Sequence, residues 1–214
     1  MDNPWWPLFG LRLRTPRLEL RLLTDDDILA VCSFLGDLHD PAVMPFEFAF
    51  TDQPSPAREQ SAFRHFWTAR AGWRPDAWEA AFAVRLDGAT VGVQSLRAHA
   101  FATVREVDTG SYLRRDVQGQ GIGTEMRIAV LALAFEGLGA RWARSGAFRD
   151  NEASRRVSEK LGYRPDGIEV KAPRGEPVVS DRFRLDGTDW PTVRDRWPSV
   201  TIEGLEACRS WFGA

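Results

Sequence analysis

Cysteine is scarce in this sequence: Cys32 and Cys208 are the only two among 214 residues, and they lie near opposite ends of the chain. Two thiols this far apart do not suggest a disulfide framework or a cysteine-rich metal site. We therefore expect two buried or idle free thiols in a cytoplasmic protein.

Long hydrophobic runs are also missing. The longest apolar stretch, Ile128 to Phe135, is far shorter than the ~20 residues that span a bilayer. The chain opens with Met1-Asp2-Asn3-Pro4 and lacks a basic segment followed by an apolar run, so we expect no secretory signal here.

Neither sign of charge dominates. The 28 basic and 30 acidic residues leave a net charge of -2, which gives no electrostatic case for nucleic acid or an anionic membrane as partner. The composition, 43% hydrophobic and 27% charged, is that of an ordinary globular protein and excludes disordered, collagen-like and coiled-coil chains. A length of 214 residues suits one domain.

Hydrophobic spacing predicts the elements of the first half of the chain. Alternating leucines predict one strand, kinked at Pro16, over residues 11–22, and an acidic start predicts a helix from Thr24 to about Leu38. The proline-rich segment from His39 to Pro56 predicts no regular element. A second helix is expected over residues 57–71, followed by strands over 78–86, 91–95 and 106–113, the first two joined by a hairpin at Asp87-Gly88.

The second half changes character at a glycine-rich loop, Gln118 to Gly123. The pattern predicts a helix over 124–136, a strand over 141–148, a helix from Asp150 to Leu161, a strand over 178–185, a short helix over 189–196 and a strand over 200–202. We find no internal repeat and no linker.

The glycine-rich loop is the sharpest chemical signal. Its pattern, Gln118-x-x-Gly121-x-Gly123, lies between a predicted strand and a predicted helix. Glycines let the backbone approach a phosphate, and the N–H groups of a helix N-terminus point towards such an anion. A tight turn with flexible glycines is the alternative interpretation. A nucleoside-triphosphate P-loop is excluded because the required lysine is missing, and the dinucleotide fingerprint fails because residue 124 is Thr.

Four ordered motifs resemble the Gcn5-related N-acetyltransferase (GNAT) superfamily. The loop resembles its acyl-CoA pyrophosphate signature, and Asn151 to Tyr163 is similar to its "Asn…Glu-Lys-Leu-Gly-Phe" helix. Thr15 to Arg21 and Asp108 to Leu113 resemble two strands of its ribosomal-protein N-acetyltransferase-like branch. The whole chain, with His39-Asp40-Pro41 and Met44-Pro45-Phe46, looks most like an actinobacterial subgroup of that branch.

The resemblance implies an α/β fold in which a mixed, mostly antiparallel sheet splays between two parallel strands and is flanked by helices. It implies one acyltransferase domain over residues 1–214, with a core over about 11–190 and a C-terminal extension over 191–214. It also implies acetyl-CoA or another acyl-CoA as co-substrate, held by the loop amides and by the strand end, whose backbone N–H would polarise the thioester carbonyl. The implied CoA-binding residues are Leu113, Gln118, Gly119, Gln120, Gly121, Ile122, Gly123, Thr124 and Asn151. For Asn151, a simple helix cap is the alternative role.

Acyl transfer to an amine needs a group that assists departure of the CoA thiolate. Many superfamily members use a Tyr seven residues after the Asn, but this chain has Ser158 there. Ser154, three residues after Asn151, stands where the resembled branch often has its proposed thiol donor. Ser154 could instead stabilise the helix start.

A general base must also take the proton of the amine. Asp108 is our first choice, and Glu106 lies two residues away on the same strand face. The alternative for Glu106 is a solvated edge position. Glu169 and Asp181 are further candidates, and His99 is more simply a polar strand end.

The sequence does not identify the acceptor amine, which is a small molecule or a protein amine. The family default is acetyl transfer, with succinyl as a second possibility. By resemblance, the acceptor would be taken near the His39–Pro56 segment, where Phe46, Phe48 and Phe50 are either a pocket wall or core anchors. We expect direct transfer in a ternary complex and no metal, since His39 and His65 lack a metal-ligand context. A CoA-binding scaffold without catalysis is the competing hypothesis.

Nine tryptophans complete the sequence-based expectations. Trp5, Trp6, Trp190, Trp197 and Trp211 lie near the chain ends. Aromatic clusters of this kind suit a homodimer interface. They would equally suit ends that fold back on their own domain.

Overall fold

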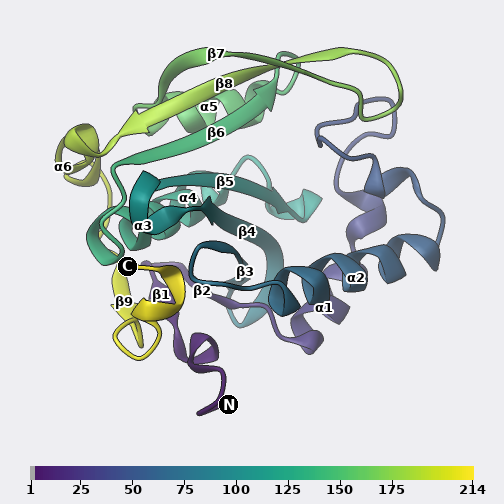
Figure 1. Cartoon of the computed structure of the whole chain (residues 1–214). Helices are drawn as coiled ribbons and strands as arrows, with labels where there is room; N and C mark the ends of the chain where they lie inside the picture. Colours follow the sequence, from purple (N-terminus) through teal and green to yellow (C-terminus); the bar gives the residue numbers. More distant parts are fainter. Residues whose placement is uncertain (1–2) are drawn as a thin grey trace.

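A computed structural model describes residues 3–214 and contains, within that range, one nine-stranded sheet (Figure 1). The strand order across the sheet is β7-β8-β6-β5-β4-β3-β2-β1-β9. The strands are β1 (Arg12–Arg14), β2 (Leu18–Leu22), β3 (Ala77–Leu86), β4 (Ala89–His99), β5 (Glu106–Leu113), β6 (Trp142–Phe148), β7 (Arg164–Lys171), β8 (Val178–Asp186) and β9 (Thr201–Glu203). This mixed sheet with flanking helices confirms the predicted fold class.

The two central strands β5 and β6 form the one parallel pair among the described residues. Their paired residues run from Glu106↔Trp142 to Thr109↔Ser145 and stop there. Beyond that point β5 continues along β4 as far as Leu113, whereas β6 continues along β8 as far as Phe148. The sheet therefore forks after Thr109 and Ser145, and Figure 1 shows the two strands diverging.

Helices cover both faces of the sheet. α1 (Asp25–Cys32) and α2 (Ala57–Ala71) pack on one face, against buried residues of β3 and β4 such as Ala81, Ala83 and Val93. α4 (Ile122–Ala132) and α5 (Glu152–Lys160) pack on the other face, where α4 is buried in the larger core cluster. Short helices α3 (Phe101–Val104) and α6 (Trp190–Arg194) complete the set.

The N-terminal elements differ from the sequence prediction in two places. The single kinked strand is wrong: β1 and β2 are separate strands that pair antiparallel, Leu13 opposite Leu20, around a turn at Pro16. The proline therefore makes the turn of a hairpin instead of a kink. The first helix ends at Cys32 and only a 3₁₀ turn over Leu35–Asp37 follows, so its predicted end near Leu38 is too late.

In the second half, the glycine-loop helix starts two residues earlier than predicted and ends as a π-helical turn over Leu133–Gly137. Hydrophobic spacing did not predict strand β7 (Arg164–Lys171). Pro165 and Gly167 interrupt its alternation, and the register shifts between Pro165 and Ile168. An edge strand tolerates both residue types because one side of its backbone pairs with nothing.

The chain ends fold back on the rest of the protein. β9 pairs with β1, and Phe212 and Cys208 are fully buried. The rings of Trp6 and Trp211 pack edge to face at 4.8 Å, and Trp190 is 5% exposed. Of the five terminal tryptophans, only Trp5 is highly exposed, at 86%. The other four, Trp6, Trp190, Trp197 and Trp211, pack on their own chain, which is the second of the two interpretations given above.

Both cysteines are free thiols, as expected. Burial raises the pKa of Cys32 and raises the pKa of Cys208 to about 11, so neither thiol is activated as a nucleophile. The helices of the described part of the chain include none that is long and apolar enough to cross a membrane.

A buried carboxylate joins α1 to the sheet. Asp27, only 2% exposed, closes a capping box with Thr24 and accepts hydrogen bonds from Arg21 at 3.2 Å and Thr90 at 2.9 Å. Burial alone raises the pKa of Asp27, but the hydrogen bonds from Thr24, Thr90 and Arg21 outweigh it and hold this pKa below its ordinary value. The ionised carboxyl thus links α1 to β2 and β4.

We predict that Asp27→Ala lowers the free energy of unfolding by about 3 kcal/mol, because it removes the buried carboxylate with which the Arg21 guanidinium pairs. Urea denaturation measures this, with exposed Asp26→Ala as the matched control that changes it little. The depressed pKa means that Asp27 stabilises the fold fully above the ordinary aspartate pKa of ~3.9 and loses this effect as pH falls. The stability difference between wild type and Asp27→Asn should shrink below about pH 4, and a constant difference would contradict the assignment.

Candidate functional site

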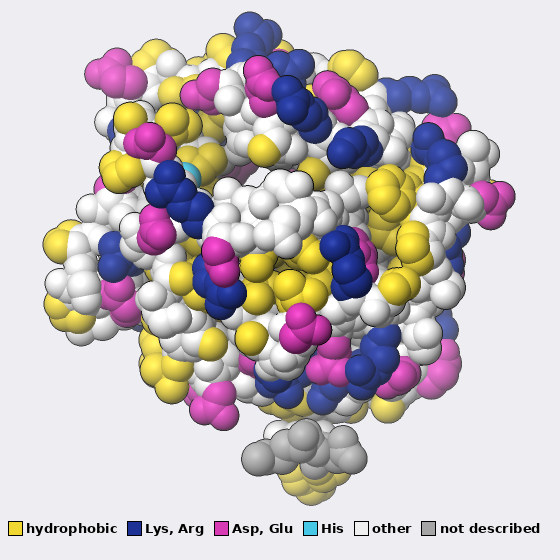
Figure 2. Space-filling view, turned by 180° about the vertical axis from the view of Figure 1, so that it is seen from behind, with side chains coloured by type: hydrophobic (Ala, Val, Ile, Leu, Met, Phe, Trp, Pro, Cys, Tyr) yellow, Lys and Arg dark blue, Asp and Glu magenta, His cyan; other side chains and the backbone are white. Residues whose placement is uncertain are grey.

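One large cavity of about 1860 Å³ occupies the fork between β5 and β6. Its lining includes the glycine loop and α5 on one side of the sheet, and the segment before α2 together with β7 and β8 on the other. On the face of the molecule that Figure 2 presents, positive and negative side chains are interspersed, with no field of a single sign. The cavity connects the two faces of the sheet through the fork.

The glycine loop has the geometry of an anion cradle. Gly119 and Gly121 have φ angles of +75° and +80°, and Gly121 is the N-cap of α4. The Gln118 amide donates to the backbone oxygens of Leu113 at 2.8 Å and Leu38 at 2.9 Å. Gln118 thus ties the loop to the end of β5. At the start of α4, the backbone N–H of Thr124 donates to the Gly121 oxygen at 3.2 Å, whereas helix geometry offers the N–H groups of Ile122 and Gly123 no intrahelical acceptor. This arrangement suits a phosphate-type anion.

Arg17 lies beside this loop and was not singled out in the sequence. Its guanidinium donates to the backbone oxygen of Gln120 at 3.1 Å and pairs with Glu125 of α4. An added Cβ on Gly121 would come 3.5 Å from it. Arg17 belongs to the stretch Thr15 to Arg21, which the sequence marked only as a strand motif.

Asn151 and Ser154 lie at the start of α5 and line the cavity. The side-chain oxygen of Asn151 accepts from the backbone N–H of Ser154 at 3.1 Å, so the capping role of Asn151 is present. Within residues 3–214, the Ser154 hydroxyl itself makes no hydrogen bond, whereas Ser158 is fully buried and donates to Ser145 at 3.3 Å. Of the two serines, only Ser154 has its hydroxyl free for a ligand.

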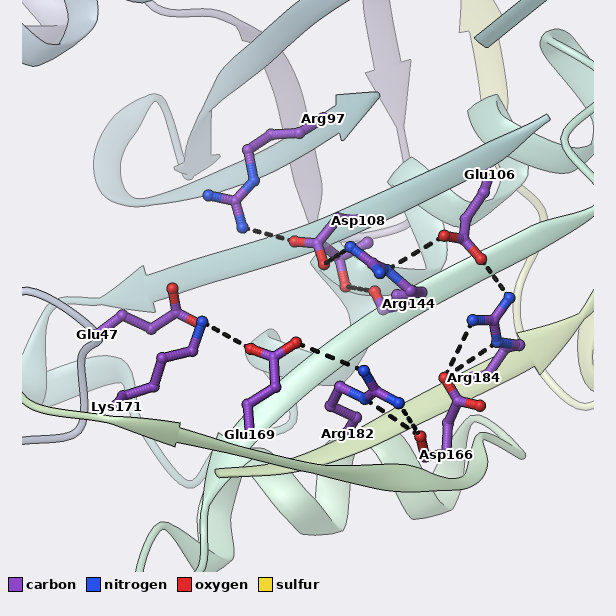
Figure 3. Close-up of polar contacts among 11 residues, drawn as sticks. Glu47, Arg97, Glu106, Asp108, Arg144, Asp166, Glu169, Lys171, Arg182 and Arg184 are labelled. Carbon is purple, nitrogen blue, oxygen red and sulfur yellow. Dashed lines mark hydrogen bonds and ion pairs between the residues drawn. The ribbon is translucent and has the colours of Figure 1, made fainter. Parts of the chain in front are cut away.

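Asp108 and Glu106 share a strand face, as predicted, but neither is a free carboxylate (Figure 3). Asp108 accepts from Arg97 at 2.5 Å and lies 3.8 Å from Arg144. Glu106 lies 3.3 Å from Arg144 and pairs closely with Arg184. The interpretation of Glu106 as a solvated edge residue is wrong, because its side chain is 16% exposed and bonded to two arginines.

The alternation of charge continues along β7 and β8. Glu169 contacts Lys171 at 2.6 Å and Arg182 at 3.7 Å, and Lys171 reaches Glu47 of the proline-rich segment at 3.6 Å. Figure 3 shows this series of ion pairs along the face of the sheet opposite α4. Asp181 points elsewhere: its partners are Arg149 at 3.1 Å and Arg155 at 4.0 Å.

Glu79 is a further acid at the cavity that the sequence patterns did not indicate. Glu79 of β3 lies 3.7 Å from His65 of α2, and both line the cavity with Arg97. Burial raises the pKa of Glu79, but His65 and Arg97 outweigh this and keep the pKa below its ordinary value. His99, at the exposed end of β4, also lines the cavity. Only tertiary structure brings α2 and β3 together here.

The proline-rich segment forms one wall of the cavity. Phe46 and Phe50 pack against Tyr112 with ring centroids 6.1 Å apart in each case, so they anchor the segment. Phe48 is 76% exposed and lines the cavity. Phe46 and Phe50 line the cavity too, so these two residues are both anchors and wall, whereas Phe48 is an exposed part of the wall.

An ion pair joins two loops that lie far apart in the sequence. Arg174, between β7 and β8, donates twice to Asp52 at 2.7 Å and once to the backbone oxygen of Pro41 at 2.9 Å. We call these contacts the Arg174 latch. They join the β7–β8 connection to the proline-rich segment.

The arrangement offers an anion cradle, a forked strand pair and a row of charged groups within one cavity. Among residues 3–214, no cluster of three or more His, Cys, Asp or Glu side chains has the geometry of a metal site. The chemistry that fits is transfer of a group from a phosphate-bearing donor through the fork to a polar acceptor on the opposite face.

Comparisons with known proteins agree with this geometry. Residues 17–164 match the family described as acetyltransferase (GNAT) domain. The fold is similar to Mycobacterium smegmatis RimJ in complex with CoA-disulfide, with TM-score 0.73, 19% identity and 94% of each chain covered. It is also similar to a GCN5-related N-acetyltransferase from Brucella melitensis, with TM-score 0.67, 20% identity, and 86% of this chain and 82% of that chain covered.

A third similar structure is RimL, described as a ribosomal L7/L12 alpha-N-protein acetyltransferase in complex with coenzyme A. Its TM-score is 0.65 at 15% identity, covering 80% of this chain and 95% of that chain. At these identities the likeness establishes a shared fold.

We predict that removing either half of the Arg174 latch loosens the proline-rich segment without unfolding the protein. Arg174→Ala and Asp52→Ala should each raise amide hydrogen exchange in residues 39–52 and shift the free energy of unfolding by at most about 1 kcal/mol, because exposed ion pairs contribute little. The double variant should match either single variant. Additive effects in the double variant would show that the two side chains act separately.

Proposed function

The chain belongs to the acetyltransferase (GNAT) domain family, and from that premise we propose that it is an acyl-CoA-dependent N-acyltransferase. The proposed reaction moves an acetyl group, or a succinyl group as the second option, to a primary amine. Transfer is direct, within a ternary complex, because Cys32 and Cys208 do not line the cavity and burial raises the pKa of both thiols. The observation that carries the proposal is the glycine cradle opening into the β5–β6 fork.

We place the CoA pyrophosphate at the amides of residues 118–124, with the Arg17 guanidinium, which also pairs with Glu125, at the rim. The fit rests on Gly119 and Gly121, whose positive φ angles and open surroundings leave room for the backbone to contact an anion. The pantetheine arm follows the unpaired edge of β5 towards Leu113, and Asn151 is free to donate its amide N–H. A backbone N–H of β5 polarises the thioester carbonyl, and such a donor contributes ~10²–10³ in rate.

The proton tasks divide between the two faces of the fork. On the α5 side, the Ser154 hydroxyl donates to the departing thiolate, since no protein group among residues 3–214 engages it. On the other side, Asp108 and Glu106 attract the protonated amine and accept its proton through water. Both carboxylates line the cavity beside their arginine partners.

The acceptor enters along the wall formed by Glu47 and Phe48, opposite the CoA cradle. The row of ion pairs on that face suits an amine that also carries polar or acidic groups, as a small zwitterion or a protein N-terminus does. The similar structure of RimL, described as an alpha-N-protein acetyltransferase, supports a protein amine as one option. We propose no nucleic acid or membrane partner. A homodimer remains part of the proposal, because the edge strand β7 exposes Ile168 and Val170.

A CoA-binding scaffold without catalysis is the competing function, favoured by the arginine pairs on Asp108 and Glu106 and by Ser158 in place of a tyrosine. Release of free thiol from acetyl-CoA in the presence of an amine panel separates the two functions. Binding of CoA with no release above background for any amine would support the scaffold.

We predict that Gly121→Glu abolishes CoA binding in calorimetry, because the side chain fills the cradle and adds like charge. The matched control is Gly88→Glu in the β3–β4 hairpin. Gly88 has an almost identical φ of +81°, so the control carries the same backbone strain away from the cradle. Gly88→Glu should bind CoA as wild type does, and unchanged affinity in the Gly121 variant would refute the placement.

We predict that Ser154→Ala lowers turnover by roughly tenfold to a hundredfold while leaving CoA affinity and stability unchanged. The helix cap survives because Asn151 bonds the backbone N–H of residue 154, not its hydroxyl. The measurement is steady-state thiol release together with a thermal melt. Normal turnover in a folded variant would show that Ser154 has no part in thiol departure.

A further inference from the structure

Arg127 of α4 is a buried positive charge that the mechanism above does not use. It is 4% exposed, on the side of the sheet covered by α4 and α5, and it lines the cavity. Its guanidinium donates to Ser145 at 3.1 Å, Ser111 at 3.3 Å and the Gln94 side-chain oxygen at 3.4 Å. All three partners are neutral.

No carboxylate neutralises this charge. Within residues 3–214, Arg127 forms no salt bridge, whereas Arg97, Arg144, Arg182 and Arg184 on the opposite side of the sheet each pair with at least one acid. A buried charge without a counter-ion is costly and is normally paired. The unpaired guanidinium therefore indicates an anion, permanent or developing, that arrives with the substrate.

Arg127 lies at the point where β5 and β6 separate. Ser145 is the last residue of β6 that pairs with β5, and Ser111 lies on β5 just beyond the point of separation. Arg127 thus contacts both strands where they part. Ser145 also accepts from Ser158, the residue that stands where a tyrosine acid is usual in similar proteins.

The surroundings of Arg127 are hydroxyl groups. Within residues 3–214, the Tyr163 hydroxyl is buried and has no hydrogen-bond partner. Burial raises the pKa of this phenol, and the Arg127 charge opposes part of the rise. Hydroxyls can rotate to donate to an anion without carrying charge of their own. The site is therefore built to hold a cation close to the fork and to leave its field unneutralised.

We propose that Arg127 is the fixed positive charge that stabilises the thiolate leaving group in the fork, in place of a tyrosine acid. This rests on the proposed function. In the step, the neutral amine nitrogen bonds to the thioester carbonyl carbon, the carbon–sulfur bond breaks, and sulfur leaves with the electron pair. The amine proton goes to the carboxylate side of the fork, while the Arg127 charge and the Ser154 hydroxyl, which lines the same cavity, stabilise the sulfur anion.

The test measures ionisation of the CoA thiol in the binary complex, which needs neither an acceptor nor turnover. Thiolate absorbance in the ultraviolet is followed through a pH titration, and the same titration with desulfo-CoA subtracts Cys32 and Cys208. In wild type the bound thiol should be more acidic than that of free CoA, with its pKa lower by about 1–3. Thermal melts and calorimetric CoA affinity accompany every titration.

Two substitutions separate charge from hydrogen bonding. Arg127→Gln keeps polar contact with the serines but removes the charge, and the bound thiol should return to the acidity of free CoA while turnover with acetyl-CoA falls by about 10²-fold. Arg127→Lys keeps the charge and should retain most of the acidification. Arg64→Met, on an exposed position of α2, is the control for loss of a positive charge elsewhere.

Three results would overturn the inference. The first is a wild-type bound thiol no more acidic than free CoA, which needs no folded variant to observe. The second is equal loss of acidification in folded Gln and Lys variants, which would assign Arg127 a purely geometric role. The third is an altered ratio of acetyl-CoA to succinyl-CoA turnover in Arg127→Gln with unchanged acidity of the bound thiol, which would mean that Arg127 determines specificity for the acyl group. Failure of wild type to bind CoA would instead refute the proposed function itself.

Discussion

The end of pairing between β5 and β6 is the constraint on which the site depends. Parallel strands that stop pairing at Thr109 and Ser145 leave unpaired backbone edges, and such groups must find other partners or line a cavity. Here each strand keeps its other neighbour, β4 or β8, so the sheet stays intact while a passage opens through its centre. The glycine loop is fixed to this passage by Gln118, which bonds the last residue of β5.

The two sides of the fork differ in how charge is handled. On the side of α1 and α2, carboxylates and guanidinium groups alternate across five strands, and each is paired, so that face is polar but nearly neutral (Figure 3). On the side of α4, a single guanidinium is surrounded by hydroxyls and an amide. The passage thus has paired charges on the side of α1 and α2 and an unpaired guanidinium on the side of α4. This arrangement suits a reaction in which negative charge develops on the side of α4.

Local patterns predicted much of the fold. The alternation in β3 to β5, the Asp87-Gly88 hairpin and the helices at 57–71 and 152–160 follow from periodicity and turn chemistry, which act between near neighbours. Errors arose where a proline had two possible meanings, as at Pro16, and where Pro165 and Gly167 interrupted the pattern of β7. The glycine loop and Asn151 could be found because their spacing is local to one loop and one helix start.

The sequence by itself indicated the family, the glycine loop at a helix start and the position of Ser154 in the first turn of α5, because these depend on residues a few positions apart. Only the tertiary structure decided that Asp108 and Glu106 are paired, since Arg97, Arg144 and Arg184 reach them from three other strands. It likewise brought Glu79 to His65, Arg174 to Asp52, and Arg127 to the serines of two strands. These contacts join residues from 11 to 122 positions apart, and no local spacing rule encodes such a pairing, because it depends on strand order and register across the whole sheet.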